Sequence, residues 1–329
     1  MSATFLATLT PMLTLFTCIA IGFAVHKAHL LPENAGKVMA KMLTWIFYPA
    51  LSFMTMANYC TVESLTTHAT NIVLASFCVT LSVGLGIALA RLFVPEKRYE
   101  RGVYRYALAF ANSAYMGDPL VQAIFGDAVL AYYKLFCLPL TIVIYSWGVS
   151  QMVPGSSDLR STLKKIFNPP MVAMLLGIVA GLTNLTRVMP QFLTGTLNTL
   201  KACMGPMAML LVGFTIASYG IVSMLKKKKV YVATFLRLTV LPTIIIGALF
   251  GLKTAANALF GLGIDNTVLF LCFFAVATPL GMNTVVFPEA YGGDPEPGAS
   301  MALVSHTLCV ITIPLLFALM VYLFGGISI

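Results

Sequence analysis

Long apolar stretches follow one another along nearly the whole chain, and short polar connections separate them. A membrane-spanning helix needs about 20 predominantly apolar residues, and ten stretches of roughly this length can be counted. They lie at about residues 4–26, 38–58, 71–94, 104–125, 129–152, 169–186, 193–224, 230–252, 266–287 and 299–324. Apolar residues make up 59% of the 329 and charged residues 9%, which excludes a soluble globular protein. The pattern predicts ten transmembrane helices.

Lysine and arginine are distributed unevenly between the two sides that ten helices define. If the N-terminus lies outside, fifteen of the 20 basic residues fall on inner loops or their margins. They are Lys27, Lys37, Lys41, Arg91, Lys97, Arg98, Arg101, Arg105, Arg160, Lys164, Lys165, Lys226, Lys227, Lys228 and Lys229. Cytoplasmic loops retain basic residues. We therefore expect a multi-pass protein of the cell membrane with both termini on the non-cytoplasmic side.

Several function classes lack the residues they need. The net charge is +9, but the cations sit in short runs, so no nucleic-acid-binding patch is predicted. The seven cysteines show no CxxC or Cys/His spacing, so we expect neither a metal site nor a disulfide framework. The sequence contains no GxSxG, HExxH or P-loop motif. We therefore expect neither an enzyme nor a bound cofactor.

Two similar stretches lie in opposite halves of the chain. FANSAYMG begins at residue 110 and FAVATPLG at residue 274, so Phe, Ala and Gly recur 164 positions apart (274 minus 110). Each stretch is followed by a Gly-Asp pair and then by a span with one interior proline, Pro139 or Pro314. Pro49 and Pro206 form a further pair. Chance similarity among membrane helices is the alternative, but together the matches favour a duplication.

The duplication determines the predicted topology. Half of ten is an odd number, so the second copy enters the membrane upside down relative to the first. We divide the chain into a first five-helix repeat, residues 1–152, a cytoplasmic linker, residues 153–168, and a second, inverted repeat, residues 169–329. The predicted fold class is an all-α membrane protein with ten transmembrane helices in two inverted five-helix repeats.

Residues that interrupt helices cluster in the fourth and ninth spans. Proline removes a backbone donor and glycine lets the chain open, so backbone groups become free to bind a ligand. Half-helix N-termini that meet at mid-membrane carry about half a positive charge each and favour an anion. A simple proline kink in each span is the alternative. The predicted substrate-binding residues are Asn112, Ser113, Gly117, Asp118, Pro119, Thr278, Pro279, Gly281 and Asn283.

These stretches resemble the auxin efflux carrier family, whose bacterial members include carriers for malate and malonate. The resemblance rests on FANSAYMGDPLVQAIFGDAVLAYY, residues 110–133, and on ATPLGMNTVVFPEAYGGDPEPGASMALVSHTLCVITIPLL, residues 277–316. It implies a fold like that of bile-acid symporters and sodium/proton antiporters, with crossed, broken helices four and nine. It also implies scaffold and transport parts drawn from both repeats, an elevator mechanism, and substrate binding at Asn112 and the prolines near the crossing.

Asp118 and Lys134 lie at similar depths in consecutive spans. Asp118 is thirteen residues beyond Arg105, which is ~20 Å from the inner face. Lys134 is six residues after Ala128, which places it ~21 Å from the same face across a ~30 Å core. Unpaired charges at this depth are costly, so the spacing predicts a salt bridge. The alternative is that Lys134 extends outward and Asp118 bonds to backbone amides.

Two further polar residues lie within spans. His306 is a candidate for a supporting or proton-coupling role, whereas a hydrogen bond to a helix carbonyl is the alternative. The resemblance to the auxin efflux carriers does not extend to His306, where the family more often has a smaller residue. Arg237 lies eight residues after Lys229 and is expected to extend its side chain to the membrane surface.

The sequence predicts a secondary transporter of a small organic anion, such as malate, malonate or an auxin-like carboxylate, that works by alternating access. No nucleotide-binding element is present, so an ion gradient or the membrane potential must drive transport. A passive anion channel and a sodium- or proton-coupled symporter are the alternatives. The expected partners are the substrate and the lipid bilayer, and not a nucleic acid. Coupling to a proton or sodium and a homodimer are left open.

Overall fold

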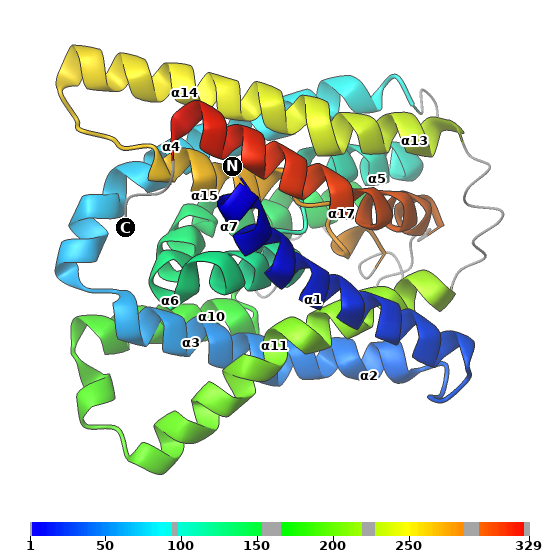
Figure 1. The fold of residues 1–329 in the computed structure, drawn as a ribbon, viewed down its shortest axis with the longest axis horizontal. Coiled ribbons are helices and arrows are strands. Elements are labelled where there is room, and N and C mark those ends of the chain that lie inside the picture. The colour runs from blue at the N-terminus through cyan, green and yellow to red at the C-terminus, as the bar shows by residue number, and fades with distance from the viewer. Residues whose placement is uncertain (1, 94–97, 153–165, 219–227, 286–295, 326–329) are drawn as a thin grey trace.

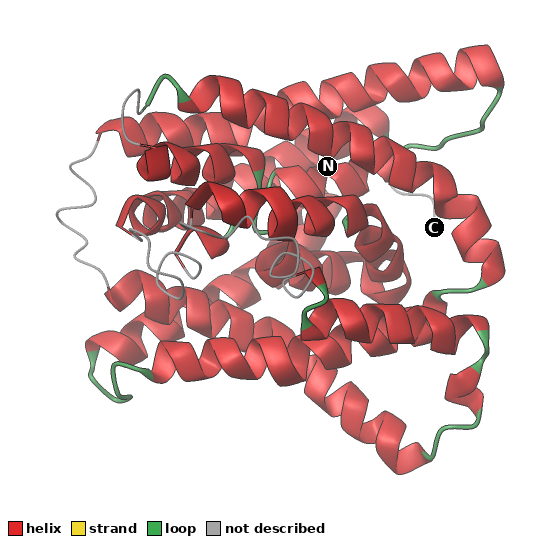
Figure 2. Cartoon of the chain, turned by 180° about the vertical axis from the view of Figure 1, so that it is seen from behind, coloured by secondary structure: helices red, strands yellow, loops and turns green. Residues whose placement is uncertain are grey.

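The computed structural model describes residues 2–93, 98–152, 166–218, 228–285 and 296–325. Within these ranges every regular element is a helix, as Figure 2 shows. The elements are α1 (Ser2–Lys27), α2 (Ala35–Met42), η1 (Leu43–Phe47), α3 (Tyr48–Tyr59), α4 (Val62–Ala90), α5 (Arg98–Ala109), η2 (Ser113–Gly117), α6 (Asp118–Phe136), α7 (Leu138–Val143), η3 (Ile144–Gly148), α8 (Val149–Met152), α10 (Pro169–Leu182), η4 (Leu185–Arg187), α11 (Gln191–Ser218), α13 (Lys228–Phe235), η5 (Leu236–Val240), α14 (Leu241–Phe260), α15 (Thr267–Val276) and α17 (Glu296–Phe324). The predicted all-α class is confirmed.

Four helices of the described chain are long and apolar enough to cross a membrane, and a bent pair makes a fifth candidate. They are Ala69–Ala90, Gln191–Ser218, Lys228–Phe260 and Pro297–Phe324, and the bent pair is Ser113–Phe136 with Leu138–Met152. Other predicted spans are shorter helices, such as α10, or chains of helices with a break. The count of ten spans and their inverted arrangement therefore stay predictions. Most of the predicted linker, residues 153–165, lies outside the described residues.

Three of the π-helical turns in the described chain each end two residues before a proline. They are η1 before Pro49, η2 before Pro119 and η5 before Pro242. A proline lacks a backbone donor, and its ring clashes with the carbonyl four residues earlier, which here lies inside the π turn. The wider turn relieves that clash, so the helix continues after each proline instead of ending.

The helices pack in two groups (Figure 1). The first helix group consists of α1, α2, η1, α3, α10 and α11, which pack mainly on one another. The second helix group consists of α4 to α8, α13, η5, α14, α15 and α17. Contacts between the groups are made chiefly by α1, α3 and α11 with α6, η2 and α17. The two groups therefore meet at the helices that carry the predicted binding residues.

Two glycines allow α1 and α11 to pack closely. A Cβ atom on Gly22 would collide with the carbonyl oxygen of Leu210, and one on Gly213 would collide with the carbonyl oxygen of Ile19. Backbone therefore approaches backbone at two points along this pair. Small residues at helix interfaces are the usual means of association in membranes, where burial of apolar surface provides no driving force.

Candidate functional site

The fourth predicted span is interrupted between α5 and η2, and the ninth is interrupted after α15. Residues 110–112 and 277–282 are not helical. An isolated antiparallel β-bridge joins Ala111 of the first break to Leu280 of the second. The backbone N–H of Asn112 donates a hydrogen bond to the backbone carbonyl of Pro279 at 2.7 Å. Lipid offers no hydrogen bonds, so each break satisfies backbone groups of the other. Both predicted interruptions are present, and they lie in contact at what we call the crossing.

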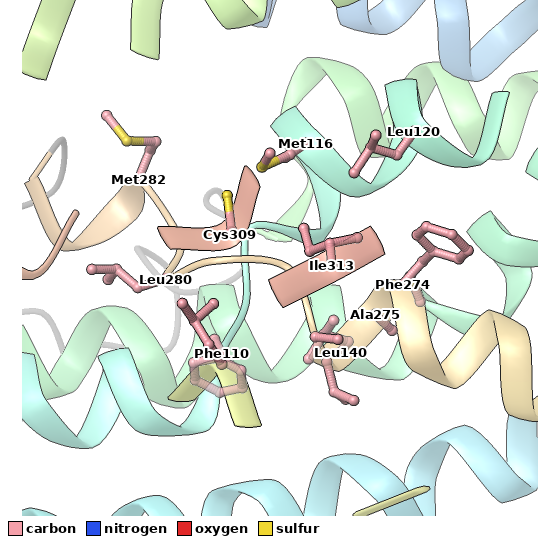
Figure 3. Close-up of a cluster of buried hydrophobic side chains, with 14 of the residues drawn as sticks. Phe110, Met116, Leu120, Leu140, Phe274, Ala275, Leu280, Met282, Cys309 and Ile313 are labelled. Carbon is pink, nitrogen blue, oxygen red and sulfur yellow. The ribbon is translucent and has the colours of Figure 1, made fainter. Parts of the chain in front are cut away.

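Apolar side chains surround the crossing (Figure 3). Phe110 and Leu280 come from the two breaks, Leu140 comes from α7, and Cys309 and Ile313 come from α17. All five are buried in one continuous hydrophobic cluster. The packing gives the crossing a low-dielectric surrounding, in which satisfied hydrogen bonds are strengthened and unsatisfied ones are costly.

A cavity of about 70 Å³ lies beside the crossing, where the two helix groups meet. We call it the crossing cavity. Six predicted residues line it: Asn112, Ser113, Asp118, Lys134, Gly281 and Asn283. Asn112 and Asn283, from the two breaks, thus share one cavity, as predicted. Sequence reasoning missed further polar lining residues: Tyr48, Ser52, Tyr115, Thr141, Tyr145 and Asn168. Tyr48 and Ser52 are four residues apart in an apolar span, which places two polar side chains on the same face of a helix. This spacing could have indicated a polar site from the sequence.

Five other predicted residues do not line the crossing cavity, although all except His306 lie on the same helices and breaks. They are Gly117, Pro119, Thr278, Pro279 and His306. Gly117 leaves room for Tyr133, since a Cβ atom there would collide with the Tyr133 hydroxyl. That hydroxyl lies 3.1 Å from the Ser113 carbonyl oxygen and 3.2 Å from that of Phe274. Tyr133, which nothing in the sequence singled out, therefore bridges η2 and α15.

The predicted salt bridge between Asp118 and Lys134 is present. Lys134 Nζ lies 2.7 Å from Asp118 Oδ2, and the two side chains are only 5% and 4% exposed. Lys134 also donates to Ser52 Oγ at 3.3 Å and lies 4.6 Å from the ring centroid of Tyr48. The pair belongs to the second helix group, whereas Tyr48 and Ser52 belong to the first. The two opposite charges neutralise each other at the junction of the groups.

Asn112 and Asn283, the asparagines that the two breaks contribute to the crossing cavity, are each held by another side chain. His306 Nδ1 lies 2.9 Å from the Ala302 carbonyl, which can only accept, so Nδ1 carries the proton. A neutral ring then accepts at Nε2, and the Asn112 Nδ2 atom donates to it at 3.3 Å. Asn283 Nδ2 donates to the Tyr106 hydroxyl at 2.9 Å. His306 therefore makes the hydrogen bond to a helix carbonyl that the sequence offered as the alternative to a supporting role. It also contacts Asn112, a residue of the crossing cavity.

A second ion pair joins the two helix groups. Lys201 Nζ of α11 lies 2.6 Å from Asp127 Oδ2 of α6, and Gln122 donates to the other carboxylate oxygen at 2.8 Å. Asp127 follows Gly126, whose φ of 82° interrupts the helical geometry within α6. This left-handed backbone favours glycine. Asp127 is 31% exposed, so this ion pair is more accessible to solvent than the pair of Asp118 and Lys134.

The expectation that Arg237 reaches the membrane surface is wrong. Arg237 is only 2% exposed, because α5, α13 and α17 enclose it. In the described part of the chain, none of its guanidinium nitrogens has a hydrogen-bond partner. Packing of neighbouring helices, which a single sequence does not reveal, overrides the tendency of long cationic side chains to extend toward water.

Comparison with known proteins gives the family. A family model described as a membrane transport protein matches residues 7–161 and residues 156–317, which together cover most of the chain. The chain belongs to this family of auxin efflux carriers. An uncharacterized transporter of Methanothermobacter thermautotrophicus is 22% identical over 217 residues, which span 64% of this chain and 69% of that protein. As an auxin efflux carrier family member, the chain is a multi-pass membrane protein with a transport role.

Proposed function

We propose that this auxin efflux carrier family protein is a secondary transporter of a small organic anion, a mono- or dicarboxylate, which binds in the crossing cavity. One observation carries the proposal: two broken helices exchange backbone hydrogen bonds beside a cavity that both helix groups line. Broken helices at a site between two bodies are typical of carriers that expose the site alternately to each side.

The charges around the crossing cavity support an anionic substrate. Asp118 and Lys134 cancel each other at 2.7 Å, so they add no net charge. The first amides of η2, at Ser113, Ala114 and Tyr115, have no acceptor within their own helix, and these residues line the cavity. A helix N-terminus carries about half a positive charge. A carboxylate is the group that accepts from several such amides at once.

The size of the crossing cavity favours a small carboxylate. Its volume is about 70 Å³, whereas pockets for drug-sized ligands are about 300 to 1,000 Å³. In the same measure of volume, ~10 to 15 Å³ holds one water molecule, so the crossing cavity has room for a few heavy atoms. A compact carboxylate of the malonate or malate kind therefore fits better than an aromatic auxin-like carboxylate, which would require the walls to move.

The arrangement of the helix groups supports an elevator mechanism. In this proposal the second helix group carries the crossing and moves against the first, while the Asp118 and Lys134 pair slides past Tyr48 and Ser52. The proposed setting is the cell membrane with the basic loops inside and both termini outside. Assembly as a homodimer and coupling to a proton or sodium are both compatible with this proposal.

Counterflow in proteoliposomes tests this proposal. Vesicles loaded with unlabelled malonate or malate should accumulate the labelled carboxylate, whereas empty vesicles should not. The Asn112→Ala variant should reduce the initial rate more than it reduces thermal stability, since it removes a donor worth ~1 to 3 kcal/mol from a partly wet site. Imposed pH or sodium gradients in the same vesicles would identify the coupling ion.

The alternatives give different results in the same assay. A passive anion channel conducts far faster than a carrier and shows no accumulation by exchange. A sodium- or proton-coupled symporter also accumulates substrate in empty vesicles when the corresponding ion gradient is imposed. Protein that exchanges none of a panel of carboxylates under any of these conditions would rule out the proposed substrate class.

A further inference from the structure

A much smaller cavity lies among α5, α13, η5 and α17, and it shares no lining residue with the crossing cavity. Its volume is about 10 Å³. The residues around it are Ala107, Leu108, Ala233, Thr234, Arg237, Leu280, Met301 and Ser305. Among these described residues none is acidic, and Leu280 belongs to the second break. We call this space the Arg237 cavity.

Two polar side chains at the Arg237 cavity have no partner. Arg237 and Thr234 are each 2% exposed. In the described chain, Arg237 Nε, Nη1 and Nη2 and Thr234 Oγ1 make no hydrogen bond. Arginine stays protonated in proteins, so burial cannot neutralise it. A buried cation with three unused nitrogens, beside an unused hydroxyl that can donate, is a set of groups suited to an anion.

The nearby end of α5 does not replace such a ligand. Ala107 and Leu108 of its last turn border the Arg237 cavity, and the carbonyls there carry partial negative charge. A helix end amounts to only about half an elementary charge spread over several groups. No carbonyl of this turn accepts a hydrogen bond from Arg237. The guanidinium therefore keeps a large part of its charge and all of its donors.

We propose that Arg237 and Thr234 hold one small inorganic anion of the chloride type at the Arg237 cavity. A cavity of about 10 Å³ accommodates roughly one water-sized particle. A carboxylate has three heavy atoms and needs more room, which separates this site from the crossing cavity. Bound anion gives Arg237 its counter-charge and fixes η5 against α17 and the second break. The proposal does not depend on the transported substrate.

Equilibrium binding of radiolabelled chloride to the purified full-length protein tests this assignment directly. Wild-type protein should bind about one chloride per chain in a saturable manner, and excess bromide should compete whereas gluconate should not. Arg237→Met should abolish binding. Thr234→Val should weaken it by about tenfold, because a donor to a charged ligand is lost. Lys253→Met removes a cation from α14, sixteen residues beyond Arg237 (253 minus 237), and should leave binding unchanged.

Thermal unfolding provides a second readout that does not require a folded Arg237→Met protein. The wild-type Tm should rise saturably when chloride replaces gluconate at constant ionic strength, since a ligand bound only by the folded state stabilises it. The Tm of Lys253→Met should rise equally, and that of Thr234→Val should rise only at higher chloride. Absence of saturable chloride binding to the wild type, or binding that Arg237→Met retains, would overturn the proposal.

Discussion

His306 on α17 accepts a hydrogen bond from Asn112 at the first break, although the two residues lie 194 positions apart. The bond between Asn112 Nδ2 and His306 Nε2 is 3.3 Å long and requires a neutral imidazole ring. It fixes one amide hydrogen of Asn112 and thereby the direction in which the rest of that amide points. The chemistry of the crossing cavity is thus determined partly by a residue outside its lining.

Replacement of His306 should act through this orientation. His306→Leu removes the acceptor, and we expect the initial rate of carboxylate exchange to fall by roughly 10-fold or more. His306→Gln retains an acceptor oxygen and should preserve a larger part of the rate. Proteoliposome exchange and the Tm of each variant provide the measurements. Equal losses for Leu and Gln would contradict an orienting role.

Breaking the Asp118 and Lys134 pair should be more harmful than removing it entirely. Lys134→Met leaves a buried carboxylate without its partner, which typically costs ~3 to 5 kcal/mol. The double variant Asp118→Asn/Lys134→Met removes both charges and should regain much of the lost thermal stability. Neither protein should transport normally, because both lose the contacts of Lys134 with Ser52 and Tyr48 of the first helix group. A Lys134→Met protein that exchanges substrate normally would contradict this role.

Gly117 should be sensitive to a single added methyl group. Gly117→Ala forces the Tyr133 hydroxyl from its position between Ser113 and Phe274, so both transport and Tm should fall. Tyr133→Phe removes the obstructing oxygen, and the double variant should lose less stability than the two single changes added together. Thermal unfolding of the four proteins gives the coupling energy. Gly195→Ala is the matched control, because nothing lies within 4 Å of a Cβ there.

The ion pair of Lys201 and Asp127 should hold the two helix groups in their present arrangement. Because Asp127 is 31% exposed, losing the pair should cost only ~0.5 to 1 kcal/mol of stability. If the groups move during transport, Lys201→Met and Asp127→Asn should each raise the exchange rate by up to about fivefold. The exchange rate of the double variant should equal that of each single variant, because both substitutions remove the same ion pair. Unchanged rates in all three would argue against movement at this contact.

The sequence was sufficient for the all-helical class and for the two interruptions, because proline, glycine and asparagine act on the backbone locally. It was also sufficient for the Asp118 and Lys134 pair, because depth in the membrane follows from residue counts. The division into residues 1–152 and 169–329, and the substrate-binding roles of the individual residues, stay predictions.

Other parts of the site depend on contacts between distant helices. Tyr133 and Tyr106 are aromatic residues in apolar spans, where most such residues only fill space. Nothing in their local sequence indicates that their hydroxyl groups hold Ser113 and Asn283. The same limitation led to the wrong expectation for Arg237, whose surroundings come from α5 and α17.

The π turn η1 has a consequence for the tolerance of this chain to deletions. A π turn spans one more residue per hydrogen bond than an α-helical turn, so it sets the angle at which α3 leaves α2. Loss of one residue from Leu43–Phe47 would convert the π turn into an ordinary α-helical turn, in which the Pro49 ring again clashes with the carbonyl four residues earlier. The helix would kink at Pro49, and Tyr48 and Ser52 would be displaced from Lys134. Single-residue deletions here should therefore abolish transport even where the protein still inserts into the membrane.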